Sequence, residues 1–188
     1  MKNTRLFIML GVFIFLTGII ILCSTVFTLN TVEIGWLSTT KVLSEKTDTE
    51  IIDSGEFKFG ESVFLLKKDK YKQKLEKNNP YIKVLGLELK FPNQLKITVS
   101  EREELYVVKV TNENSSSGFS YVYLDYDLKV LKITDTPVPA NQQNPAIVTI
   151  DGLDYSVNDF EVGTLTNMPI GDTLKSIGYM LTSTGYTN

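Results

Sequence analysis

The chain has 188 residues, 43% of them hydrophobic, and a formal net charge of −3. This length allows one or two small domains with cores of their own. Histidine is absent and Cys23 is the single cysteine, so the chain lacks the commonest general base and the commonest zinc ligands. Disulfide-stabilised folds and thiolate metal clusters are excluded. We expect no enzyme, and the sequence predicts no catalytic, cofactor-binding or metal-binding residue.

Residues 6–29 form an apolar stretch without a charged residue. As a helix, this stretch would be about 36 Å long, more than the roughly 30 Å hydrocarbon core of a bilayer. Lys2 and Arg5 precede it, and Glu33 is the first charge after it. Because positive residues stay on the cytoplasmic side, we expect residues 1–5 to be a cytoplasmic tail and the remainder of the chain to lie outside the cytoplasm.

Two other interpretations of the apolar stretch stay open. A cleaved signal peptide would have a shorter apolar core and then a small-x-small cleavage site, and residues 25–30 offer no convincing site. A lipoprotein anchor at Cys23 would need a small residue before the cysteine, where Leu22 stands. We therefore favour an uncleaved single-pass anchor, in which Cys23 is an apolar residue facing lipid.

Charge divides the rest of the chain into two modules. Residues 67–109 contain eleven basic and six acidic residues, whereas residues 135–188 contain six acidic residues and one basic residue. Such asymmetry indicates separate modules. Residues 111–120 and 134–145 are rich in Ser, Asn, Pro and Gly and are predicted to be loops.

The first module is predicted to begin with a strand and a helical region. Residues 31–36 form a short β-prone run. Residues 38–55 are predicted to be one helix or two, because Ser38, Thr39 and Thr47 are all possible N-caps. This region therefore supplies the first part of a mixed α/β pattern.

A second, lysine-rich helix is predicted within residues 67–80. Tyr71 and Leu75 lie four residues apart and give it one apolar face, and Pro80 ends it. The lysine-rich face could contact anionic headgroups or wall polymers. A solvated helix face explains the same pattern, and we favour that interpretation.

A β-hairpin is predicted over residues 81–103, with its turn at Pro92 and Asn93. Its inner face is predicted to carry apolar residues that alternate with polar ones: Leu85, Leu87, Leu89, Phe91, Leu95, Ile97 and Val99. Ile82 and Val84 are out of phase with Leu85, which predicts a β-bulge near Val84. Together these elements predict a three-stranded sheet with two helices on one face.

The second module is predicted to be mainly β with one late helix. Residues 105–110 form a strand pattern, and residues 120–133 form a hairpin that turns at residues 125–127. Residues 146–153 are another strand pattern, and residues 170–185 have apolar residues at helical spacing.

Clustered acidic residues could indicate chemistry. Glu101, Glu103 and Glu104 could be carboxylates for glycosidic or metal chemistry. No cleft signature accompanies them, so we favour a solubilising junction. Asp125 and Asp127 lack the glycine and the distal glutamate of a calcium loop, and a polar hairpin turn explains them better.

Three segments resemble a known family. "GESVFLL" (60–66) looks like a Gly-x-Asn-x-Phe turn with Ser62 in place of Asn. "NNPYIKVLGLELKFPNQLKITVSER" (78–102) looks like an entry strand followed by a Pro-Asn-x-Leu-x-Ile-x-Val-x-Glu-Arg hairpin. "YLDYDLKVLKI" (123–133) looks like a hairpin that opens a β domain. Over residues 52–133 the chain thus resembles the FtsQ/DivIB family of bacterial cell division proteins.

The resemblance implies an α+β fold in four parts. After the tail (1–5) and a transmembrane helix (6–29) we expect a POTRA domain (30–105) of β-α-α-β-β order, with a three-stranded mixed sheet and two helices. A mainly antiparallel FtsQ-type β domain with a late helix (106–188) follows, and it is possibly truncated, because the family continues into more strands. A usual Gly-Asn pair after the first strand, and a proline after Glu-Arg, are absent.

The resemblance also implies a function. We expect a non-enzymatic divisome scaffold that recruits and positions single-pass division proteins at the septum. The implied partners are FtsB/DivIC-like and FtsL-like bitopic proteins and, indirectly, the septal wall synthase, with membrane lipid around residues 6–29 and no nucleic acid. The alternatives are a membrane-anchored cell-wall-binding or wall-modifying protein, and a transport or secretion role for the POTRA domain.

Interaction sites are predicted only in outline. Glu101 and Arg102 are expected to be an interdomain hinge, where charges pair across the two modules and fix their angle. Partner-binding residues are not assigned. Edge strands invite strand addition, and the scattered tyrosines are candidate anchors: Tyr121, Tyr123, Tyr126 and Tyr155.

Overall fold

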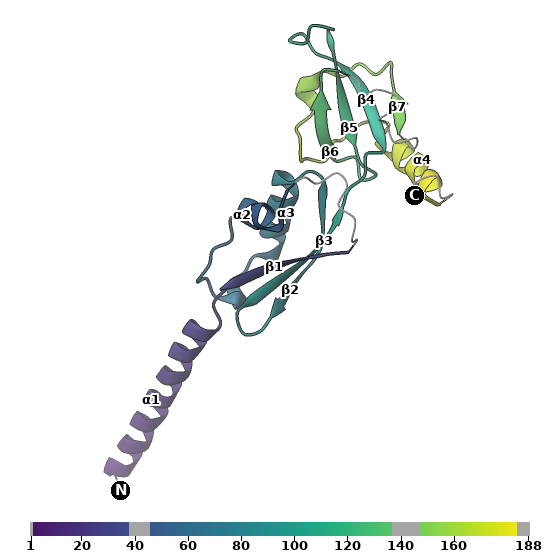
Figure 1. The fold of residues 1–188 in the computed structure, drawn as a ribbon. Helices are drawn as coiled ribbons and strands as arrows, with labels where there is room; N and C mark the ends of the chain where they lie inside the picture. The colour runs from purple at the N-terminus through teal and green to yellow at the C-terminus, as the bar shows by residue number, and fades with distance from the viewer. Residues whose placement is uncertain (1, 38–45, 137–146, 184–188) are drawn as a thin grey trace.

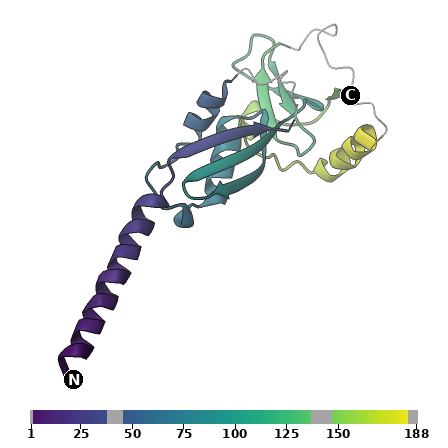
Figure 2. The same cartoon turned by 60° about the horizontal axis from the view of Figure 1, so that its bottom comes forward.

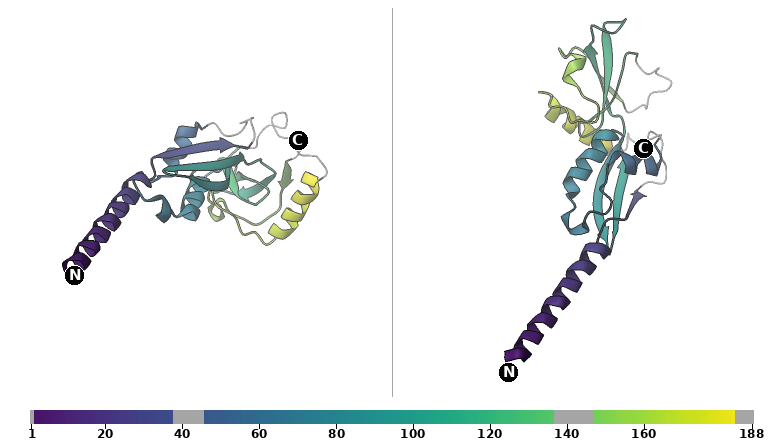
Figure 3. Two further views of the ribbon diagram at one scale, coloured as in Figure 1. Left: turned by 90° about the horizontal axis from the view of Figure 1, so that it is seen from below. Right: turned by 90° about the vertical axis from the view of Figure 1, so that its left-hand side faces the viewer.

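The computed structural model describes residues 2–37, 46–136 and 147–183, and its parts follow one another along an extended molecule (Figure 1). A long helix, α1 (Lys2–Val26), leads into a first sheet, and a second sheet lies beyond it. Two further views show α1 projecting away from both sheets (Figure 3). The α+β fold class is confirmed.

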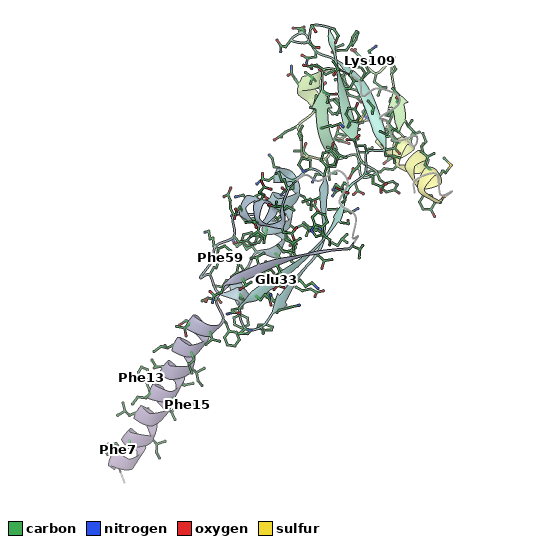
Figure 4. All side chains as sticks on the ribbon, viewed as in Figure 1. Phe7, Phe13, Phe15, Glu33, Phe59 and Lys109 are labelled. Carbon is green, nitrogen blue, oxygen red and sulfur yellow. The ribbon has the colours of Figure 1, made fainter. Side chains whose placement is uncertain are left out.

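Helix α1 has the length and composition of a membrane span. Residues Phe7–Val26 form the single helix in the described part of the chain that is long and apolar enough to cross a bilayer. None of that window is buried in the protein, and Phe7, Phe13 and Phe15 project from it (Figure 4). The helix is consistent with a single-pass membrane anchor. It begins at Lys2, earlier than residue 6.

The first sheet has the predicted mixed topology. Its strands stand in the order β1-β3-β2, with β1 parallel and β2 antiparallel to β3. The elements are β1 (Thr31–Trp36), α2 (Asp48–Ser54), the 3₁₀ turn η1 (Val63–Leu65), α3 (Lys68–Asn78), β2 (Ile82–Lys90) and β3 (Gln94–Glu101). This is the predicted β-α-α-β-β order.

Both helices of this unit pack on one core. Ile51 of α2 and Tyr71 and Leu75 of α3 are buried together with the inner residues of the strands, and Figure 2 looks onto the strands with α3 behind them. Thr47 is the N-cap of helix α2, and its side chain forms a capping box with Glu50. The other candidate caps, Ser38 and Thr39, lie outside the described residues.

The predicted β-bulge is confirmed, but two inner-face assignments, Leu85 and Phe91, are wrong. The register of β2 against β3 shifts between Val84 and Gly86. Leu85 is the residue skipped by the shift and is 45% exposed, because the extra residue turns its side chain away from the core. Phe91 is also exposed, since it lies in the turn beyond the sheet.

The second sheet is mainly antiparallel. Its order is β6-β5-β4-β7, and only the β4–β7 pair among these is parallel. The elements are β4 (Tyr106–Thr111), β5 (Phe119–Leu124), β6 (Val130–Thr134), β7 (Val148–Ile150), the 3₁₀ turn η2 (Val157–Asp159) and α4 (Gly171–Ser183). Leu174 of the late helix is buried in a second core with Tyr106, so each sheet has its own core.

Candidate functional site

A cluster of buried charges joins the two sheets, and Arg102 is at its centre. Arg102 follows the last residue of β3, and its backbone N–H donates to the Tyr81 carbonyl (2.8 Å). Its side chain is only 6% exposed. A guanidinium in so buried a place needs partners for its donors.

The guanidinium of Arg102 contacts three separate elements. Nη1 donates to Asp125 Oδ2 and to Asp127 Oδ2 (2.9 Å) in the turn between β5 and β6. Nη2 lies 3.4 Å from Glu76 Oε2 on α3, and Nε lies 3.3 Å from the Ile82 carbonyl oxygen at the start of β2. One side chain therefore bonds the first sheet, its second helix and the hairpin of the second sheet.

The hairpin turn is built to present its carboxylates. Asp125 is 3% exposed, and its Oδ1 accepts the backbone N–H of Lys129 (2.8 Å) while Oδ2 faces Arg102. Leu128 takes a left-handed conformation (φ 64°), which lets the chain reverse in this short space. Asp125 thus closes its own turn and pairs across the junction.

Lys129 makes a second buried bond between the units. Its Nζ donates to the Glu76 backbone carbonyl (2.6 Å) near the end of α3 and lies 3.8 Å from Glu76 Oε2. Burial lowers the pKa of Lys129 to about 8, and the nearby charge of Arg102 adds to this, against the opposing carboxylates. Glu76 Oε1 in turn accepts the N–H of Val84 (2.8 Å), where β2 begins its bulge.

Charge pairing outweighs burial for two other members of the cluster. Burial alone would raise the pKa of Asp127, but bonds from Lys83 (2.7 Å) and Arg102 hold that pKa below its usual value. Burial would likewise lower the pKa of Arg102, whereas Asp125 and its neighbours raise it. Both groups are therefore held in their charged forms.

Further contacts surround this cluster. Lys77 on α3 pairs with Glu161 (2.9 Å), and a Cβ on Gly163 would lie 2.2 Å from the Lys77 carbonyl oxygen. Glu104 accepts from the Tyr81 hydroxyl (2.6 Å) and pairs with Lys132 (2.7 Å). We call the six charged residues that meet where the two sheets join the junction cluster: Arg102, Asp125, Asp127, Glu76, Lys129 and Lys83.

The buried polar groups of the junction cluster are bonded within the protein. No buried side-chain nitrogen or oxygen in the described part of the chain lacks a hydrogen-bond partner. A shallow surface hollow is lined by Glu101, Glu103 and Glu104 together with cluster residues. The Glu104 carboxylate there is bound to Tyr81 and Lys132.

Two comparisons with known proteins found a match. Residues 41–102 match the family model described as "POTRA domain, FtsQ-type". The chain is also similar to "Cell division protein DivIB" of Clostridium acetobutylicum, with 27% identity over 114 residues, which is 61% of this chain and 40% of the relative. An FtsQ-type POTRA domain thus lies within residues 41–102, and the chain is similar to a DivIB cell division protein. The chain matches less than half the length of this relative, and no solved structure matches the chain.

The two predicted hinge residues, Glu101 and Arg102, occupy different places at the end of the POTRA match. Arg102 ends the POTRA match and is at the centre of the junction cluster. Glu101 is half-buried at the end of β3, opposite Ile82 in the sheet. Their role in setting the interdomain angle stays a prediction.

Sequence reasoning missed most partners of Arg102. Asp125 and Asp127 were assigned to a polar turn, which they do form, but their link to Arg102 has no local signature. For Glu76 and Lys129, one sequence feature each could have indicated a buried charge. Glu76 is the acidic residue beside the apolar face of a lysine-rich helix, and Lys129 interrupts an apolar strand pattern.

The candidate tyrosine anchors differ in accessibility. Tyr123 is buried (1% exposed), Tyr121 and Tyr155 are half-buried, and Tyr126 is 38% exposed. Tyr106 had not been singled out. Its hydroxyl donates to the Leu174 carbonyl (2.5 Å), which fastens α4 to β4, and burial raises its pKa.

Proposed function

We propose that this protein is a membrane-anchored, non-enzymatic scaffold of bacterial cell division. Helix α1 would span the cytoplasmic membrane with its N-terminus inside, and both sheets would lie outside the cytoplasm at the septum. The POTRA domain would occupy residues 30–105, and an FtsQ-type β domain residues 106–188. The observation that carries the proposal is an FtsQ-type POTRA domain bonded through buried charges to a second, mainly β unit.

The junction cluster supports a positioning role. A scaffold that sets the distance and direction of its partners needs units that do not turn freely against one another. Arg102 and Lys129 bridge the two units from buried positions, and Gly163 lies directly against the backbone of α3. With Glu101 beside it, Arg102 would fix the angle between the units, and anchoring in a plane would raise the effective concentration of partners.

The partners we propose are single-pass division proteins of the FtsB/DivIC-like and FtsL-like kinds. Through them the scaffold would act indirectly on the septal wall synthase. The second sheet ends in β6 on one side and β7 on the other. The edge of such a sheet offers backbone N–H and C=O groups to which a partner segment can add as a strand.

Localisation tests the division role first. A fluorescent protein fused to the N-terminus of the full chain should gather in a ring at the division site. Uniform fluorescence around the envelope would contradict the proposal. It would favour the alternative of a wall-binding or wall-modifying protein, which co-sedimentation with purified peptidoglycan and a cleavage assay would then detect.

A pull-down tests which unit binds. The full chain should capture the two bitopic proteins from detergent extracts, and a chain without residues 111–188 should lose them. The truncated chain must keep its fold for this comparison, which the fluorescence of Trp36 in the POTRA domain can report. Full capture by a folded truncated chain would overturn the assignment of binding to the second unit.

A further inference from the structure

Exposed apolar side chains gather at the base of the POTRA domain, where α1 ends. Phe64 is 62%, Leu65 69% and Phe91 63% exposed. Phe27, the first residue after α1, lies among them and is half-buried. We call Phe27, Phe64, Leu65 and Phe91 the basal patch. Exposed apolar groups gathered in this way mark an interaction surface more often than isolated ones do.

Three segments that are distant in sequence build the basal patch. The ring of Phe27 lies 5.4 Å from that of Phe64 in η1, and 6.2 Å from that of Phe91 in the β2–β3 turn. The rings of Phe64 and Phe91 are 5.8 Å apart. These separations are those of aromatic rings in direct contact, so the tertiary fold holds the three rings together.

Backbone hydrogen bonds fix the patch to the end of α1. The Phe27 carbonyl accepts a hydrogen bond from the Val63 N–H (2.9 Å). The Leu29 N–H donates to the Glu61 carbonyl (2.8 Å), and the Leu29 carbonyl accepts from the Gly60 N–H (2.9 Å). Leu29 itself is fully buried in the POTRA core. Because the chain joins the domain within three residues of Val26, the domain cannot swing freely on its anchor.

The length of α1 places the patch at a definite depth. Residues Phe7–Val26 would be about 30 Å long as a helix, which equals the hydrocarbon thickness of a bilayer. Val26 would then lie at the outer hydrocarbon boundary. The polar layer beyond it is about 5–7 Å thick. The ring centroids of Phe64 and Phe91 lie 5.4 and 6.2 Å from that of Phe27, which directly follows Val26, so the patch lies within reach of this layer.

Charged neighbours of the patch suit the same environment. Lys67 and Lys68 follow η1, Lys90 precedes Phe91, and all three are exposed. Lysine stems can lie along apolar surface while their ammonium groups reach phosphate oxygens. Apolar groups flanked by lysines are the pattern of protein surfaces that lie in a membrane interface.

We propose that the basal patch is a lipid-binding surface, seated in the outer interface of the bilayer that α1 spans. This proposal rests on the proposed anchoring by α1. Phe64, Leu65 and Phe91 enter the boundary between headgroups and acyl chains, and the lysines meet the phosphates. The patch thereby adds contacts that restrain the tilt of the POTRA domain, and hence the direction in which the second sheet is carried away from the membrane.

Lipid-borne quenchers test this contact on the full chain. In a Cys23→Ser background, Leu65→Cys is labelled with an environment-sensitive fluorophore and placed at one copy per nanodisc of phosphatidylethanolamine and phosphatidylglycerol. Lipids with a nitroxide at the top of the acyl chain should quench most of the label's emission, and aqueous iodide should quench little of it. The double substitution Phe64→Ser with Phe91→Ser should reduce the lipid quenching.

Two matched positions make the result decisive. Leu165 in the second unit is as exposed as Leu65 (69% each), and a label on Leu165→Cys should respond to iodide instead of lipid. A label on Ile21→Cys within α1 should be quenched by lipid whenever the anchor is inserted. Lipid quenching at 21 with iodide quenching at 65 would overturn the proposal and leave the anchoring intact. Shielding at 65 that arises only with two copies per disc would overturn it in favour of self-association.

Discussion

At its membrane end the POTRA domain joins α1 through backbone hydrogen bonds and a group of aromatic rings, whereas at its outer end it joins the second sheet through buried charges. Phe27, Phe64 and Phe91 contact one another at the first junction. Arg102, Asp125 and Lys129 are the buried members of the second. Both junctions hold the domain firmly, by different means.

The difference lies in how each junction responds to single changes. Backbone bonds and apolar contacts are spread over many atoms, so one substitution removes only a part of them. A buried ion cluster is the opposite case, because removing one partner leaves the other charged group buried without compensation. We therefore expect the outer junction to be the more sensitive of the two, to substitution and to pH.

Replacement of Arg102 should have the largest effect. Arg102→Ala leaves the carboxylate of Asp125 buried and unpaired, which should lower the free energy of unfolding by about 3–5 kcal/mol. Urea unfolding of the full chain, followed by Trp36 fluorescence, measures this. Lys74→Ala is the control, because its ion pair with Glu56 lies on the surface of the POTRA domain, where Glu56 is 69% exposed, and should contribute about 1 kcal/mol or less.

The same variant tests the predicted hinge role. With spin labels at the exposed positions Glu88→Cys and Asn114→Cys, one in each unit, the Arg102→Ala chain should give a broader distance distribution than the parent in the Cys23→Ser background. An unchanged distribution would show that Arg102 stabilises the protein without setting the angle between its units.

Gly163→Ala should have the next largest effect. Gly163 has φ +84°, and a Cβ there would lie 2.2 Å from the Lys77 carbonyl oxygen, so the loop must move away from α3. We expect a loss of about 3 kcal/mol in the free energy of unfolding. Gly152→Ala is matched in backbone (φ +80°) but faces open space, and should cost about 1 kcal/mol. Equal costs would show that close packing at the junction contributes nothing.

Titration of Lys129 should have the smallest effect. Its pKa is about 8 in the folded protein and 10.5 as an ordinary lysine, so between these values the unfolded chain binds more protons. Stability should therefore rise with pH across that interval. The rise in urea midpoint should be smaller in Lys129→Met than in the parent or in the exposed-site control Lys68→Met. An identical rise in all three would refute the assignment to Lys129.

Local patterns predicted the elements of the fold well where one face is buried. The alternation along β3 and the spacing of Tyr71 and Leu75 correspond to buried positions in the structure. The phase break at Val84 marked the bulge. The assignment of Leu85 to the inner face failed, because a bulge shifts the phase by one residue and the alternation alone does not say which residue is left over.

The partners of Arg102 were beyond the reach of such patterns. Glu76 and Asp125 come from elements 26 and 23 residues away along the chain. A charged residue next to a strand has no period that reveals which distant carboxylate it will meet. The basal patch was missed for the same reason. Phe27 was assigned to the apolar stretch 6–29, Phe64 to the motif of residues 60–66 and Phe91 to the inner face of the hairpin, and no local pattern brings the three together.

The sequence by itself determined the apolar anchor, the order of helices and strands, and the resemblance to the FtsQ/DivIB family, because hydrophobic periodicity and turn residues act over a few neighbouring positions. Only the tertiary structure decided which charges are buried together at Arg102 and which aromatic side chains meet at the end of α1. Those pairings depend on how separate elements pack, and desolvation then makes a few distant charges count for more than the many exposed ones around them.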